Sequence, residues 1–118
     1  MDKNIIPKLS MKISSGGFNK FLNDGGGIDF RLNESCWSSL ENGDIFELVE
    51  EPDENNRYNV KIIKLYTASS FSKLLDSLPN KLFDKSRKDA YLEFFSQWWS
   101  TEAEQQEGTL ALHIEVLN

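Results

Sequence analysis

Asp29 and Arg31 are the residues whose types and spacing best suit a binding or proton-transfer site. They lie in the segment Ile28-Asp29-Phe30-Arg31-Leu32, where apolar and charged side chains alternate. This alternation is typical of a half-buried β-strand, and it puts Asp29 and Arg31 on the same face. An arginine there can bind a phosphate or carboxylate through two hydrogen bonds. The pattern therefore predicts a ligand-binding pair, or else a salt bridge that only stabilises the strand.

Three further side chains could contribute to a site near this strand. Trp37 follows in a polar loop, where it either stacks on a nucleobase or packs as a lid against the protein. Lys20 is the nearest lysine on the N-terminal side, and Lys12 lies on the strand expected before it. Either side chain could swing in toward Asp29.

The other side chains that could be reactive have no partner at a spacing that would form a site. Cys36 is the sole cysteine, so it cannot form an internal disulfide, and we expect a small, partly buried thiol. His113 points away from the apolar face of its segment and has no Ser, Cys or Asp at a triad spacing. The run from Asp24 to Gly27 has neither the lysine nor the hydroxyl of a phosphate-binding loop, and we expect a flexible loop. We expect no metal and no cofactor.

Length and charge limit the class of protein. The chain has 118 residues, which fits one domain over residues 1–118. The net charge of −6 counts against sequence-blind binding to duplex DNA or RNA, which relies on many lysine and arginine contacts to phosphate. A small ligand or a protein partner suits this charge better. The N-terminus has no long apolar core, and no segment approaches about 20 apolar residues, so we expect a cytoplasmic protein with no membrane partner.

The periodicity of apolar residues predicts an α+β protein with a mostly antiparallel sheet. Ser69 or Ser70 can cap the second helix, and Thr101 with Glu104 forms a possible capping box for the last one. Gly108 should end that helix. The expected strands are 9–13, 28–32, 45–49, 58–65 and 109–117, and the expected helices are 17–23, 71–78, 86–99 and 101–107.

The helix expected over 86–99 carries most of the aromatic residues of this half of the chain. We expect one of Trp98 and Trp99 in the core, while the other can be exposed. Helical spacing predicts that the residues turned toward the core are Ala90, Tyr91, Phe94, Phe95 and Trp98.

Three segments, read together, resemble the ASCH family. The first is GGGIDFRLN at 25–33, followed by Trp37 and by LENGDIF at 40–46. The second is VKIIKLYTASSF at 60–71, and the third is WWSTEAEQQEGTLALHIEVL at 98–117. The resemblance implies a PUA-like, partly open antiparallel β-barrel with helices grouped around it. It also implies a cleft for RNA, a nucleotide or a modified nucleoside, with Asn33 and Ser70 joining Lys12, Lys20, Asp29, Arg31 and Trp37 as candidate ligand contacts.

The chain departs from this family where ligands are usually touched. Some members hydrolyse an acylated cytidine nucleoside with a loop lysine, which aligns here with Gly26. Ala68 and Glu107 each stand where the family usually has a tyrosine. We therefore expect a binding module rather than an enzyme. An N4-acylcytidine amidohydrolase that uses Asp29 with a relocated lysine, and a protein-interaction module that has lost its ligand site, remain the alternatives.

Overall fold

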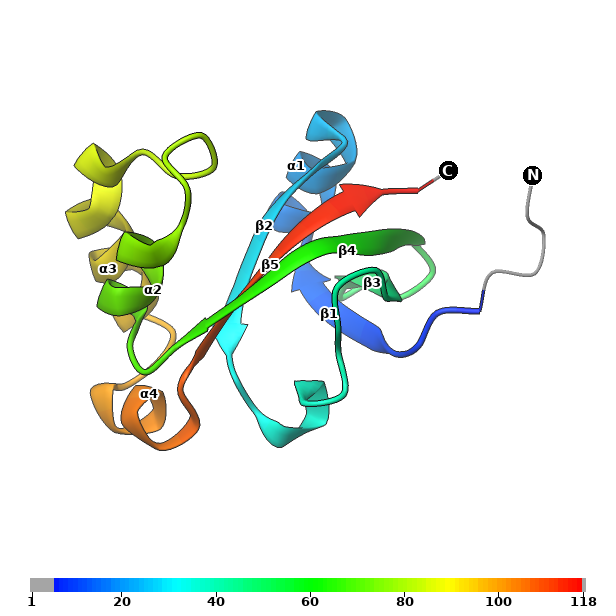
Figure 1. Ribbon diagram of the computed structural model, residues 1–118. Helices are drawn as coiled ribbons and strands as arrows, with labels where there is room; N and C mark the ends of the chain where they lie inside the picture. Colours follow the sequence, from blue (N-terminus) through cyan, green and yellow to red (C-terminus); the bar gives the residue numbers. More distant parts are fainter. Residues whose placement is uncertain (1–5, 118) are drawn as a thin grey trace. The chain divides into compact units, whose positions relative to one another are not determined.

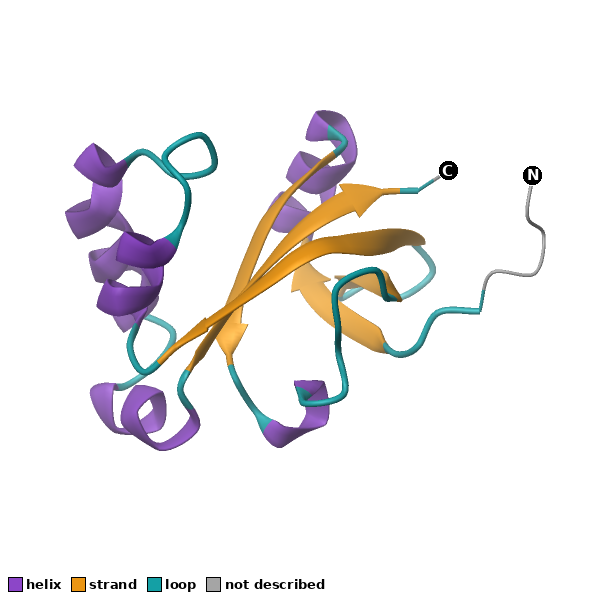
Figure 2. Cartoon of the chain, viewed as in Figure 1, coloured by secondary structure: helices purple, strands orange, loops and turns teal. Residues whose placement is uncertain are grey.

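The computed structural model describes residues 6–117, which contain both helices and strands (Figures 1 and 2). No helix within residues 6–117 is long and apolar enough to cross a membrane. In chain order, the described elements are β1 (Ser10–Ser14), α1 (Ser15–Asp24), β2 (Gly26–Leu32), η1 (Ser35–Trp37), β3 (Ile45–Glu51), β4 (Arg57–Ala68), α2 (Phe71–Ser77), η2 (Lys85–Arg87), α3 (Lys88–Ser96), α4 (Thr101–Glu107) and β5 (Thr109–Val116).

The strands form one five-stranded sheet in the order β1-β3-β4-β5-β2. β3 and β4 are antiparallel, whereas β1 runs parallel to β3, so the sheet is mixed rather than wholly antiparallel. β5 lies antiparallel to β4, because Thr109 bonds to Ala68 at one end and Leu117 to Asn59 at the other. The α+β class expected from the sequence is confirmed.

The described part of the chain packs into two compact units. The first consists of the described residues of Met1–Gly27, Glu41–Lys64 and His113–Asn118, and the second of Ile28–Leu40 and Leu65–Leu112. Strands β2, β4 and β5 each contribute residues to both units.

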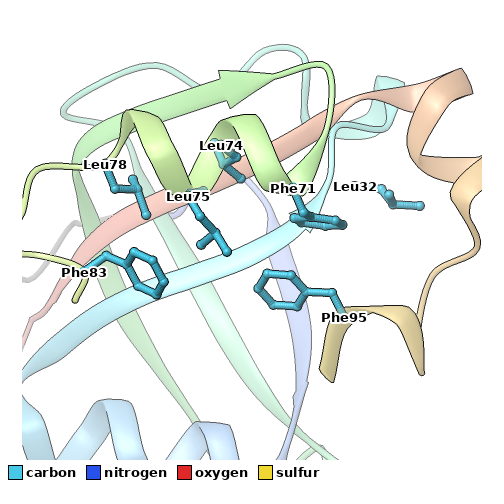
Figure 3. Packing of buried hydrophobic residues seen from close by; sticks show 8 residues of the cluster. Leu32, Phe71, Leu74, Leu75, Leu78, Phe83 and Phe95 are labelled. Atoms are coloured by element: carbon cyan, nitrogen blue, oxygen red, sulfur yellow. The ribbon is translucent and has the colours of Figure 1, made fainter. Parts of the chain in front are cut away.

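The second unit has its own aromatic and aliphatic core, built from α2, the segment that follows it, α3, β2 and β5 (Figure 3). Phe71 stacks on Trp99 with ring centroids 5.1 Å apart, and it also packs on Phe95 at 4.5 Å. α2 buries its apolar face as the sequence predicted, with Ser70 as its N-cap. The buried members of this core are Leu32, Phe71, Leu74, Leu75, Leu78, Phe83, Phe95 and Ala111.

The first unit combines α1 with the β3–β4 hairpin. Phe18 on α1 lies against Tyr58 on β4, with ring centroids 4.5 Å apart, and the Tyr58 hydroxyl donates to the Phe18 carbonyl. Glu51-Pro52 is a cis peptide bond at the tip of the hairpin. The buried apolar residues of this unit include Met11, Phe18, Phe46, Leu48, Val49, Val60, Ile62 and Ile114.

The glycine run is not the flexible loop that we expected from the sequence. Gly25 is the left-handed C-cap of α1, with φ 76°, and Gly26 and Gly27 already belong to β2, with φ 148° and 152°. A Cβ on Gly26 would lie 2.2 Å from the Ile114 carbonyl oxygen, and one on Gly27 would lie 2.9 Å from the Phe21 ring. Gly26 therefore allows β5 to approach the backbone of β2 closely, and Gly27 allows the Phe21 ring to do so.

Three other expectations were wrong in detail. The helix expected over 86–99 is η2 followed by a shorter α3. Ala90 and Phe94 on α3, and Trp98 just after it, are exposed. Phe95 and Trp99 instead make the ring contacts with Phe71 in the core.

The expected capping box and the state of the cysteine were also wrong. Ser100, not Thr101, caps α4 by accepting from the Ala103 amide. The Glu104 carboxylate instead accepts from the amide of Phe71, the first residue of α2. Cys36 is exposed rather than partly buried, since it lies on the short η1 turn.

Candidate ligand-binding site

Asp29 is a buried carboxylate on β2 whose partner is Arg31. Asp29 is 5% exposed, and the Arg31 Nε donates to its Oδ2 at 2.6 Å. The two-residue period of the strand puts both side chains on one face, as the alternating sequence predicted. A buried carboxylate is costly unless it is paired and hydrogen-bonded, so this contact is what allows Asp29 to lie inside the second unit.

Trp37 holds the Arg31 guanidinium from a second direction. The guanidinium carbon lies 5.5 Å from the centroid of the indole ring, which is within cation–π range. Arg31 thereby occupies one face of the indole, and a base that stacked on Trp37 would need the opposite face. The role that the structure shows for Trp37 is its contact with Arg31.

The indole nitrogen of Trp37 lacks a hydrogen-bond partner. Among the described residues, the Trp37 Nε1 atom is buried and makes no hydrogen bond. A buried donor left unsatisfied costs about 1–3 kcal/mol. The ring that carries this donor is the one that lies against the Arg31 guanidinium.

The segment after β2 fixes the position of Trp37. The Asn33 amide donates to the Gly108 carbonyl at 3.1 Å, and the Trp37 amide donates to the Glu34 carbonyl at 2.9 Å. The Leu40 amide then donates to the Trp37 carbonyl at 3.1 Å, and the Leu40 side chain is buried. The role seen for Asn33 is thus a backbone one, at the point where β2 ends.

Ser70 has a structural role in the second unit. Its hydroxyl accepts from the Lys73 amide at 3.1 Å as the N-cap of α2, and its carbonyl accepts from the Thr109 hydroxyl at 3.2 Å. Both contacts fix the turn between β4 and α2. The Ser70 side chain is therefore already engaged where the resemblance implied a ligand contact.

The two candidate lysines belong to the first unit, and each has an acidic partner there. Lys12 pairs with Glu54 at 3.3 Å, and Lys20 pairs with Asp24 one helical turn away at 2.9 Å. All four side chains are more than half exposed. The cation that the structure puts on Asp29 is the guanidinium of Arg31.

The arrangement of Asp29, Arg31 and Trp37 suits binding better than proton transfer. A guanidinium stays protonated in proteins, so it cannot act as a base, but it can form two parallel hydrogen bonds to an anion and stack on a planar ring. Gly26, where the family's lysine would align, has no room for a side chain. Within residues 6–117, no three His, Cys, Asp or Glu side chains are grouped so that they could hold a metal ion.

Two surface hollows occur among the described residues, one in each unit. One of about 450 Å³ is in the first unit, between α1 and the β3–β4 hairpin, with Phe18, Leu22 and Tyr58 on its wall. The other, of about 60 Å³, is in the second unit, beside Phe71, Trp99 and Glu104. Neither hollow has Asp29 or Arg31 in its lining.

Comparison with known proteins shows the fold of this chain. No family model matches the sequence, and no curated protein matches it. The crystal structure of hypothetical protein PH0355 is similar, with a TM-score of 0.71 and 20% identity over 92% of this chain and 98% of that one. The solution structure of protein PF0455 from Pyrococcus furiosus has a TM-score of 0.65 and 16% identity over 93% and 97%. At these identities the likeness concerns the fold.

Proposed function

We propose that this chain is an ASCH-type binding module that recognises RNA, a nucleotide or a modified nucleoside through Arg31. The observation that supports the proposal is the arginine held between a buried carboxylate, Asp29, and an indole ring, Trp37. A guanidinium ordered in advance loses little conformational entropy when a ligand binds, which favours affinity. Its fork matches a phosphate, and its plane matches a nucleobase.

The presence of a charged pair at a nearly buried position also supports a binding role. A buried ion pair is often no more stabilising than apolar residues of similar volume, because both charges must be desolvated. The Asp29–Arg31 pair therefore contributes little to stability. The Asp29 carboxylate does, however, hold the Arg31 guanidinium in one orientation. The unsatisfied Trp37 N–H next to them adds a donor for an acceptor oxygen of the ligand.

The charge of the chain favours a short ligand over a long one. With a net charge of −6, the chain repels an extended phosphate backbone, while a mononucleotide or a few single-stranded nucleotides need only one oriented cation. We also propose a cytoplasmic location for the protein.

The experiment is a calorimetric titration of the full chain with cytidine monophosphate, N4-acetylcytidine and an eight-nucleotide single-stranded RNA at low salt. We expect Arg31→Lys to weaken binding about tenfold, since lysine keeps the charge but loses the fork and the plane. Arg57→Lys is the matched control, because Arg57 is an exposed arginine on β4 that pairs with Glu47. The Arg57→Lys variant should bind each probe with the affinity of the wild type. Equal affinities for Arg31→Lys and the wild type, or no binding of any probe at millimolar concentration, would contradict the proposal.

The same samples distinguish the amidohydrolase alternative. Release of acetate from N4-acetylcytidine by the wild type, abolished by Asp29→Asn, would replace the binding proposal with the enzyme. Trp37→Phe gives a finer readout, because it keeps an aromatic ring under Arg31 and removes the N–H together with the five-membered ring of the indole. We expect this variant to bind more weakly and to unfold at a similar denaturant concentration, because loss of the unsatisfied donor offsets the lost packing.

A further inference from the structure

Phe94 and Trp98 form an exposed aromatic pair at the end of α3. Phe94 is 54% exposed and Trp98 is 65% exposed, and their ring centroids lie 6.1 Å apart. Single exposed apolar residues are ordinary on protein surfaces. Two large rings in contact, however, form a contiguous apolar patch, and such patches are typical of interaction sites. Aromatic side chains of this kind, tryptophan above all, provide most of the affinity at protein interfaces.

The second unit does not need this pair for its own packing. The neighbours Phe95 and Trp99 fill the core positions, with ring centroids 4.5 Å and 5.1 Å from that of Phe71. Polar residues at 94 and 98 would remove one ring contact with this core, the edge contact of Phe94 with Phe95 at 6.2 Å, and would leave those of Phe95 and Trp99 with Phe71. The aromatic pair is therefore a surface feature rather than an extension of the core.

The chain around the pair is strongly acidic. Residues 88–107 contain one base, Lys88, which pairs with Asp76 on α2. The base just before them, Arg87, lies over the ring of Tyr91 at 5.5 Å. Of the acids in 88–107, Glu104 accepts from an amide of α2. The other four form no ion pair within residues 6–117, and these are Asp89, Glu93, Glu102 and Glu107.

We propose that the surface around Phe94 and Trp98 docks a cationic amphipathic segment of a partner protein. Apolar side chains of the segment would cover the two rings, and its lysines or arginines would lie against the acids of α3 and α4. Complementary charge of this kind speeds encounter and selects partners, while the buried rings give affinity.

The charge argues against three other occupants. Phosphates of a nucleic acid and anionic lipid headgroups would both be repelled by the four acids. A second copy of this chain, docked through a two-fold axis, would face the acids with the same acids. A basic protein segment is the occupant whose charge fits the surface.

The test uses two synthetic 18-residue helical peptides with the same leucine pattern, one with lysine and one with glutamate at every polar position. Binding to the full chain is measured by calorimetry, with tryptophan emission as a second readout. We expect the lysine peptide to bind at least tenfold more tightly than the glutamate peptide. Trp98→Ser and Phe94→Ser should each weaken it about tenfold, and the double variant Glu93→Gln/Glu102→Gln about threefold.

Ile63→Ser is the matched control, because Ile63 is an exposed apolar residue on β4, 47% exposed, in the other unit. This control is needed since a chain of charge −6 attracts any cationic peptide. Equal losses for Ile63→Ser and Trp98→Ser, equal affinities for the two peptides, or no binding at 1 mM would overturn the proposal. So would a dimer in sedimentation that Trp98→Ser abolishes, or binding to single-stranded RNA or anionic vesicles that the same variant abolishes. Unfolding midpoints confirm that each surface variant folds.

Discussion

The backbone of β5 passes directly over Gly26, so that an ideal Cβ there would lie 2.2 Å from the carbonyl oxygen of Ile114. The same Cβ would lie 3.2 Å from the Cα of Glu115. Both neighbours are backbone atoms, which cannot turn aside as a flexible side chain can. The position where the ASCH resemblance aligns a catalytic lysine is therefore one at which this backbone accepts only glycine.

Gly26→Ala should lower the free energy of unfolding by about 2–4 kcal/mol, because of the backbone overlap and the φ of 148°. Gly26→Lys should be at least as destabilising and should not create hydrolysis of acylated cytidine. The measurement is urea unfolding followed by far-UV circular dichroism. Gly16→Ala is the control, since no atom lies within 4 Å of its Cβ position on α1, and it should be neutral or stabilising. A Gly26→Lys variant as stable as the wild type would show that β5 can move aside.

Glu104→Ala should destabilise the second unit by about 1–3 kcal/mol. The Glu104 carboxylate accepts from the Phe71 amide, a donor in the first turn of α2 that has no partner inside its own helix. Glu104→Gln keeps an acceptor and should lose less. Glu107→Ala, at the exposed end of the same helix, is the control and should change the unfolding midpoint little. Equal midpoints for Glu104→Ala and Glu107→Ala would mean that water replaces the carboxylate.

Lys85→Met should shorten or loosen the end of α2. The Lys85 ammonium donates to the carbonyls of Leu75 at 2.7 Å and Asp76 at 3.1 Å, and also to that of Leu78. A cation at these carbonyls satisfies acceptors that the helix end leaves open and complements the helix dipole. We expect a loss of about 1–3 kcal/mol and faster amide hydrogen exchange near Leu78. Exposed Lys81→Met is the control, and equal exchange rates in the two variants would contradict the capping role.

The stability of the first unit should depend on the ionisation of Asp44. A hydrogen bond from Lys8 and one from the Glu41 amide lower the pKa of this carboxyl from its ordinary value of 3.8. A depressed pKa gives stability that is present above the unfolded pKa and lost as the pH falls through the folded pKa. Asp44→Asn should thus be less stable than the wild type at pH 7, and the difference should shrink below about pH 3.8.

Urea unfolding at pH 7 and pH 3 measures this dependence. Lys8→Met is the companion variant, because it removes the larger cause of the lowered pKa and keeps the Glu41 amide. The loss of stability in Lys8→Met relative to the wild type should also be smaller at pH 3 than at pH 7, though by less than that in Asp44→Asn. A difference between Asp44→Asn and the wild type that is the same at both pH values would rule out the Asp44 contribution.

The central pair of the site could be predicted from the sequence because its geometry is local. Alternation over residues 28–32 puts Asp29 and Arg31 on one face whatever surrounds the strand, and the ion pair follows from their spacing. Gly108 as the end of α4 is local in the same sense, since it is the C-cap. Such features depend on a few consecutive residues.

Contacts between distant segments were decided only by the tertiary structure. Periodicity put Phe94 and Trp98 with Phe95 on the inner side of a helix, but what is covered depends on what packs against α3. Glu104 suits a capping box by spacing, yet its carboxylate meets Phe71, 33 residues away. Gly26 looked like part of a loop until β5 lay over it. Local patterns determine which residues share a face, whereas the approach of other segments determines what that face can hold.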